Sequence, residues 1–187
     1  MRFLALSLLL ACTMQHAFAA SAAQPADLFD FWLGDWNVTW SKPDGSLGKA
    51  RNHVSRILDG NVIEEQFEQD PADPAPLLKG RSLSVRDHAG LWHQAWADNQ
   101  GGFFSLTASA DGDKRLFSTA LTAVGDEVKG QRMVFHHISR NAFTWDWEGT
   151  TDGGKTWKLL WQLDYKRRAR GSFGWGKNAF PHEERST

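Results

Sequence analysis

Three ionisable side chains, Glu65, Asp98 and His137, are the candidates for acid–base chemistry in this sequence. Each lies an even number of residues from large apolar neighbours, and residues two apart point to the same face of a strand. We therefore expect all three to face the interior of the fold. A carboxyl or imidazole group in an apolar interior has a shifted pKa, which suits a general acid or base.

Ten tryptophans among 187 residues supply a second kind of chemistry. Most form pairs at even spacing, and the last predicted strand places Trp157, Leu159, Trp161 and Leu163 on one face. Aromatic side chains on inner faces either fill the core or line a pocket for a flat, apolar ligand, and both interpretations stay open. The tryptophans that we expect to line such a pocket are Trp96, Trp145, Trp147 and Trp161.

Two other polar residues are expected on inner faces and could bind a ligand. Gln94 lies two residues before Trp96, and Arg81 lies two residues before Leu83. Buried polar groups need partners. An inward Arg81 would therefore either form a structural pair with Glu65 or orient a ligand, and the sequence leaves both open.

No metal or cofactor motif accompanies these residues. The sequence has neither the HxH nor the HExxH spacing of zinc sites, and no GxSxG, Walker or GxGxxG pattern. We predict no cofactor and no metal, with haem held by His137 as an alternative.

Strands must position all of these side chains, because apolar and polar residues alternate from Gly34 to Tyr165. Short turns rich in Gly, Asp and Pro separate the segments, which is typical of an antiparallel meander. A short helical turn is expected before them, from Pro25 to Leu33. The predicted strands cover residues 36–40, 49–57, 62–67, 81–86, 91–97, 103–108, 115–120, 132–138, 142–148 and 156–165.

A meander of this length removes its exposed edges by closing on itself. We therefore predict an all-β fold, an antiparallel up-and-down β-barrel of about ten strands. Barrels of more than eight strands can enclose a cavity. A two-sheet sandwich is the alternative.

The first 20 residues have the pattern of a secretory signal peptide, with Arg2 before an apolar run and a small-x-small site at residues 17–19. Residues 9–12, LLAC, also resemble a lipobox, which would leave Cys12 lipidated. We expect a periplasmic or secreted protein. Its expected parts are a signal peptide at 1–20, a leader at 21–26, the barrel domain at 27–170 and a tail at 171–187.

Composition excludes several classes of protein. The 21 Lys and Arg nearly balance the 22 Asp and Glu, which argues against a nucleic-acid partner. No second long apolar run follows the signal, so no membrane span is predicted. Cys12 is the single cysteine, so the soluble mature form has none, which excludes disulfides and thiolate chemistry from that form.

Residues 150–157, TTDGGKTW, resemble the Asp-box hairpin known from sialidase propellers. The resemblance implies a structural role, in which Asp152 accepts hydrogen bonds from loop amides and Trp157 packs beneath the turn. An Asp-Gly-Gly sequence between two strands also predicts a hairpin from turn geometry. A single copy without an arginine cluster does not indicate a sialidase.

Gly34-Asp35-Trp36 is similar to the Gly-x-Trp opening of lipocalins and their calycin relatives. That resemblance implies that Trp36 closes one end of the barrel and that Arg167 or Arg168 packs across it. More broadly, DFWLGDW at 30–36, WHQAW at 92–96 and DNQGG at 98–102 resemble an uncharacterised family of secreted bacterial domains with a calycin-like barrel. That family has no settled activity to carry over.

These patterns favour an exported barrel that binds a small hydrophobic or aromatic molecule. The alternative is a cofactor-free enzyme of calycin type, an isomerase, cyclase or hydrolase, that uses an interior carboxylate or histidine. The sequence predicts no oligomeric state.

Overall fold

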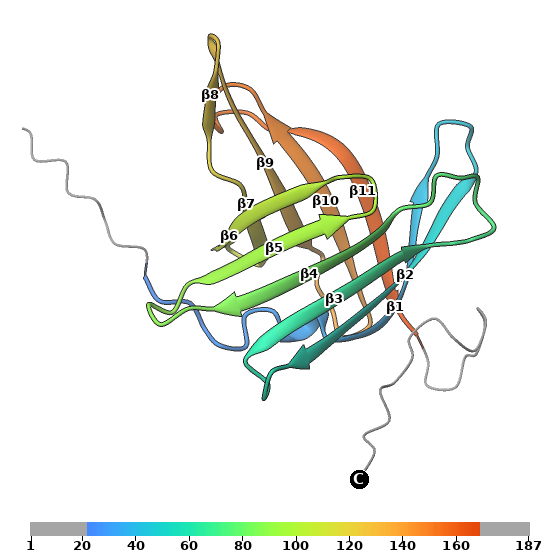
Figure 1. Cartoon of the computed structure of the whole chain (residues 1–187), viewed down its shortest axis with the longest axis horizontal. Helices are drawn as coiled ribbons and strands as arrows, with labels where there is room; N and C mark the ends of the chain where they lie inside the picture. Colours follow the sequence, from blue (N-terminus) through green and yellow to red (C-terminus); the bar gives the residue numbers. More distant parts are fainter. Residues whose placement is uncertain (1–21, 169–187) are drawn as a thin grey trace, which may run out of the picture.

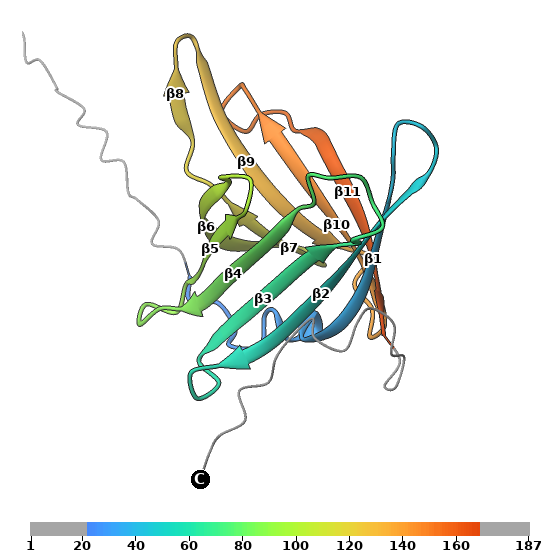
Figure 2. The ribbon, with the colours of Figure 1, turned by 45° about the vertical axis from the view of Figure 1, so that its right-hand side comes forward.

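The computed structural model describes residues 22–168, which form a closed antiparallel β-barrel (Figure 1). The sheet order is β10-β11-β1-β2-β3-β4-β5-β6-β7-β9, and pairing between β9 and β10 closes it. The short strand β8 pairs with β9 alone and extends from the barrel as an arm (Figure 2). The predicted ten-strand barrel is therefore confirmed. The expected signal peptide and tail lie outside the described residues.

The strands follow the predicted segments closely, apart from β8 and the longer start of β9. Their bounds are β1 Gly34–Ser41, β2 Leu47–Ile57, β3 Val62–Gln69, β4 Lys79–Arg86, β5 Trp92–Asp98, β6 Phe103–Asp111, β7 Lys114–Ser118, β8 Thr122–Val124, β9 Glu127–His136, β10 Ala142–Thr150 and β11 Lys158–Arg167. Within residues 22–168, no helix has the length and apolar character needed to cross a bilayer.

The chain enters the barrel through a 3-10 helix, η1 (Asp30–Trp32), which is shorter than the predicted helical turn. Trp36 follows on β1 and is completely buried. Its Nε1 donates to the Trp32 carbonyl at 2.8 Å, and the guanidinium of Arg167 lies 4.1 Å above its ring. Arg167 also donates to the Leu33 carbonyl at 2.7 Å. The packing of Arg167 across Trp36 that the lipocalin resemblance implies is present.

Gly34 leaves room for Arg167 to pack across Trp36, and replacing this glycine should destabilise the barrel. Its φ of +125° is unfavourable for other residues, and an added Cβ would lie 2.3 Å from Nη1 of Arg167. We expect Gly34→Ala to lower the free energy of unfolding by about 1–3 kcal/mol, measured by urea denaturation. Gly45→Ala is the control, because Gly45 also has a positive φ but no atom lies within 4 Å of its added Cβ. Equal losses in the two variants would contradict a role for the Arg167 contact.

The hairpin between β10 and β11 has the structural role that the Asp-box resemblance implies. Asp152 accepts hydrogen bonds from the hydroxyl and amide of Thr156, at 2.6 and 3.0 Å, and from the Thr150 hydroxyl at 2.8 Å. These bonds hold the pKa of Asp152 far below its usual value. Trp157 donates its Nε1 hydrogen to the Gly154 carbonyl at 3.1 Å. The hairpin is thus fixed by its own side chains.

A β-bulge interrupts the alternation of β11. Trp147 pairs with Trp161, but the next residue, Glu148, pairs with Leu159. This register shift leaves Leu159 and Leu160 about equally exposed, at 49% and 51%. The expectation that Leu159 shares an inner face with Trp161 is therefore wrong, because one extra residue reverses the alternation between them.

Candidate functional site

A cavity of about 140 Å³ lies inside the barrel, toward the end opposite Trp36. Its lining comes from β3, β5, β6, β9, β10 and β11, and from Leu78, just before β4. The lining includes six of the residues singled out from the sequence, namely Glu65, Trp96, Asp98, Trp145, Trp147 and Trp161. Strand alternation thus placed these six side chains correctly.

The tryptophans form two walls that meet at a right angle. The rings of Trp145 and Trp147 are parallel within 4°, with centroids 6.1 Å apart. Trp161 stands at 87° to Trp145, also with centroids 6.1 Å apart. Phe104 packs against Trp147 by its edge, with centroids 5.1 Å apart. The cavity therefore presents both ring faces and ring edges.

Asp98 fixes the position of Trp96 on another side of the cavity. A Cβ at Gly80 would lie 2.0 Å from Trp96, so only glycine leaves room for the indole against β4. Trp96 Nε1 donates to Oδ2 of Asp98 at 3.0 Å, and the amides of Gly102 and Gln100 donate to Oδ1. Burial raises the pKa of Asp98, but these hydrogen bonds outweigh it and leave the pKa below its usual value. Asp98 therefore remains an ionised carboxylate with structural partners.

Glu65 is the polar group at the inner end of the cavity. It is only 6% exposed, and it accepts hydrogen bonds from Ser82 Oγ and Asn52 Nδ2, each at 2.7 Å. Asn52 also donates to the Tyr165 hydroxyl at 3.3 Å. Burial raises the pKa of Glu65 from 4.5 to about 7, although the hydrogen bonds and the charge of Arg81 act to lower it. Glu65 can therefore gain or lose a proton near neutral pH.

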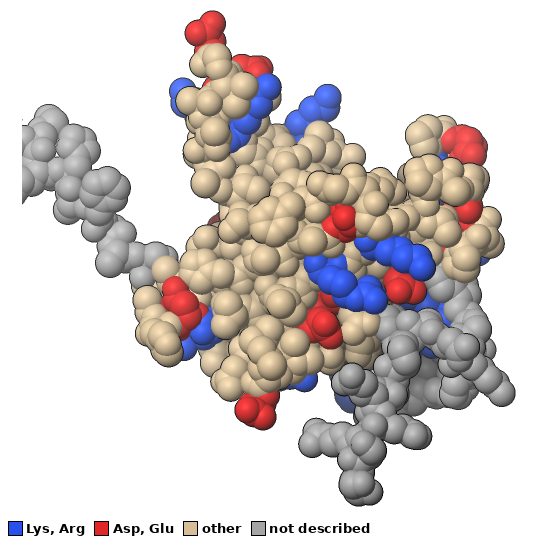
Figure 3. All heavy atoms as spheres, in the orientation of Figure 1, with Lys and Arg blue, Asp and Glu red and all other residues tan. Residues whose placement is uncertain are grey.

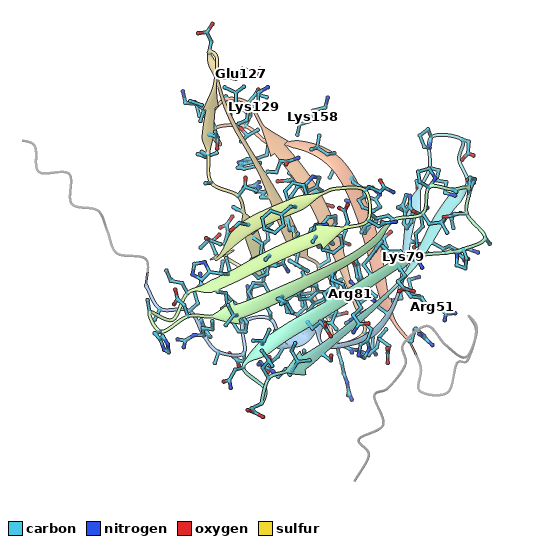
Figure 4. All side chains as sticks on the ribbon, viewed as in Figure 1. Arg51, Lys79, Arg81, Glu127, Lys129 and Lys158 are labelled. Carbon is cyan, nitrogen blue, oxygen red and sulfur yellow. The ribbon has the colours of Figure 1, made fainter. Side chains whose placement is uncertain are left out.

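The structure corrects the expectations for Arg81. This side chain is exposed on the outer face of β4, with its Nη2 3.5 Å from Oε1 of Glu68 (Figure 4). The interior pair between Glu65 and Arg81 is not formed, and the prediction that Arg81 points inward and binds a ligand is wrong. Gln94 does point inward, where it donates to Ser82 and Ser84, but it does not line the cavity.

The prediction for Arg81 failed because the two faces of β4 are reversed: its small and polar residues face the interior and its apolar residues face solvent. Its inner face carries Gly80, Ser82 and Ser84, whereas Leu83 and Val85 are 48% and 42% exposed. In Figure 3 the surface over β5 and β6 is largely uncharged, whereas the outer face of β4 also carries the Lys79 and Arg81 side chains that Figure 4 labels. Trp96 leaves no room for a larger side chain at position 80, and the serine hydroxyls donate to Glu65 and accept from the amide nitrogen of Gln94. The apolar residues of β4 consequently point outward.

The expectation that His137 faces the interior of the barrel is also wrong. It follows the last residue of β9 with a φ of +51°, and its side chain is exposed. Its Nδ1 lies 3.0 Å from Nδ1 of His136, and Nε2 of His136 lies 2.9 Å from Asp146. Because His137 does not line the cavity, a haem held by it inside the barrel is not supported. The described part of the chain has no cluster of three or more potential metal-ligating side chains.

Several lining or supporting residues were not predicted. Asn52 and Ser82 are polar residues on strands, so an interior position could not be inferred for them. Tyr165 had a usable signal, because it follows Trp161 and Leu163 at even spacing. Leu163 lines the cavity on the face that its spacing from Trp161 predicts, and the remaining lining residues, which were not predicted to line it, are apolar, namely Phe67, Leu78, Phe104 and Met133.

Comparisons with known proteins do not indicate what the cavity binds. No family model matches the chain, and no curated protein matches it. Among solved structures, the chain is similar to one described as "Crystal Structure of Rv2717c from M. tuberculosis", with 13% sequence identity and a TM-score of 0.49. That alignment covers 79% of this chain and 99% of the other. The function must therefore be inferred from the cavity itself.

Proposed function

We propose that this chain is an exported barrel that binds a small hydrophobic or aromatic molecule in its tryptophan-lined cavity. The observation that supports this most is a cavity of about 140 Å³ walled by Trp96, Trp145, Trp147 and Trp161. An apolar cavity of about 150 Å³ can hold a molecule the size of benzene. Pockets that are mostly aromatic with few polar groups are typical of small-molecule sites. The N-terminal sequence pattern supports export.

A substitution at the edge of the cavity tests this proposal. We expect fluorobenzene to bind the full chain, with a separate or shifted bound signal in ¹⁹F NMR, and Leu78→Trp to abolish binding by filling the cavity. Leu77→Trp is the matched control, because Leu77 is also half-buried but does not line the cavity. Unchanged binding in Leu78→Trp, or no binding of fluorobenzene to the unmodified protein, would count against this proposal.

The natural ligand can be sought directly. Native mass spectrometry of the protein purified from the periplasm of its own source should show a bound species of low mass. The Leu78→Trp variant purified in the same way should lack that species.

A second candidate function is cofactor-free acid–base catalysis, which the position of Glu65 favours. Its carboxyl group lines the cavity and its pKa is raised to about 7, near the value that a general acid or base needs at neutral pH. Incubation with the co-purified ligand should then yield an isomer or hydrolysis product by NMR, and Glu65→Gln should prevent it. Recovery of the ligand unchanged would exclude catalysis on that molecule.

A further inference from the structure

We propose that the cavity selects a small organic cation, an amine or quaternary ammonium compound with an apolar body, over neutral or anionic molecules of the same shape. This inference rests on the proposed function, because it assumes that the cavity takes a small ligand. The lining combines four tryptophans with two carboxylates, Glu65 and Asp98. Within the described part of the chain, no Lys, Arg or His lines the cavity.

The aromatic walls have the arrangement that attracts a cation. The negative face of an aromatic ring binds ammonium groups, and tryptophan does so best. Trp145 and Trp161 are perpendicular, so a compact cation in the corner between them can contact more than one ring. Trp96 donates its indole hydrogen to the Asp98 carboxylate, which increases the electron density of the ring.

The inner end of the cavity is also electronegative. Behind the cavity lining, Asn52 bonds to Glu65 directly and Gln94 is linked to it through Ser82, and the side-chain oxygens of both amides are buried with no hydrogen-bond partner within the described chain. In a low-dielectric interior, such oxygens and the carboxylate create a strong negative potential. The positive charge that acts on Glu65, that of Arg81, comes from the outer face of β4.

The charge of the ligand therefore decides whether the buried Glu65 carboxylate gains a counter-ion. A neutral ligand would leave a buried carboxylate without a counter-ion, and an anionic ligand would add repulsion. A cation would instead pair with Glu65. The groups that face Glu65 are Ser82 on β4, Asn52 on β2 and Tyr165 on β11. Of these only Tyr165 titrates, and its pKa is raised by burial and by Glu65, so it stays neutral.

Choline and 3,3-dimethylbutan-1-ol provide a matched pair of probes, because they have the same shape and differ by one positive charge. We expect choline to bind the full chain at least about tenfold more tightly at pH 8, a preference in the range of a desolvated cation–π contact. Quenching of intrinsic tryptophan fluorescence measures both affinities. At pH 5.5, where Glu65 is protonated, the preference should shrink.

Paired variants locate the effect. Glu65→Gln should weaken choline binding about tenfold at pH 8 and leave the affinity for 3,3-dimethylbutan-1-ol unchanged. Glu64→Gln, the same substitution on the neighbouring residue outside the cavity lining, should change neither affinity. Should Glu65→Gln fail to fold, the loss of the choline preference between pH 8 and pH 5.5 in the unmodified protein replaces it.

The three probes together distinguish a failure of this inference from a failure of the proposed function. Equal binding of the two probes, or tighter binding of the alcohol, would overturn the cation preference while supporting a small-molecule cavity. Binding of fluorobenzene without choline would do the same. A failure of all three probes would overturn both proposals. Unchanged choline affinity in Glu65→Gln would show that Glu65 is not the counter-ion.

Discussion

Trp36→Ala should lower the free energy of unfolding by about 3–5 kcal/mol, the usual cost of truncating a buried aromatic side chain. Trp36 is completely buried and packs its ring against Phe143, with centroids 4.9 Å apart. The substitution also leaves the Trp32 carbonyl without its indole donor and removes the ring beneath Arg167. Urea denaturation should show a lower midpoint with an unchanged slope, since the fold itself is retained.

Trp40→Ala is the matched control for this experiment. Trp40 lies on the same strand, four residues from Trp36, but it is only half-buried and contacts Trp161 by its edge, with centroids 5.3 Å apart. Its loss should therefore cost less stability. Folded Trp36→Ala should still bind fluorobenzene, because Trp36 does not line the cavity. Loss of binding with unchanged stability would show that Trp36 is a ligand residue and not the closure of the barrel.

The barrel could be predicted because its signals are local. Alternation with a period of two and Gly-Asp turns recur from Gly34 to Tyr165, and the even-spaced pairs Trp92/Trp96 and Trp145/Trp147 each report one strand face. The same rule placed Glu65, Trp96 and Trp161 in the cavity. The Trp36–Arg167 contact came from a resemblance, since the two residues are far apart in the sequence.

The failures have a common physical cause, which is that the inner face of this barrel is not uniformly apolar. The rule that apolar residues face inward gave the wrong side of β4, where Ser82 is needed inside as a donor to Glu65. It also failed at Leu159, where a bulge shifts the register, and at His137, where a positive φ ends the strand. Each of these depends on contacts between strands, which no single segment of sequence contains.

Glu65 should make the barrel less stable as the pH rises, by about 3 kcal/mol in total. Below pH 4.5 the carboxyl group is protonated in both the folded and the unfolded chain, so it causes no difference. Between pH 4.5 and about 7 the unfolded chain releases this proton while the folded chain keeps it, and unfolding becomes easier. Above pH 7 both states are ionised and the full cost of burying the carboxylate remains.

Glu65→Gln should remove this pH dependence, because glutamine can keep the contacts to Ser82 and Asn52 but does not ionise. The informative quantity is the difference in unfolding free energy between the variant and the unmodified protein, measured by urea denaturation from pH 4.5 to 8. Other groups titrate equally in both proteins and cancel in that difference. We expect the variant to gain about 3 kcal/mol relative to the unmodified protein across this range. A difference that does not change with pH would mean that Glu65 titrates as an ordinary carboxyl group, and would remove the main support for its role as an acid, a base or a counter-ion.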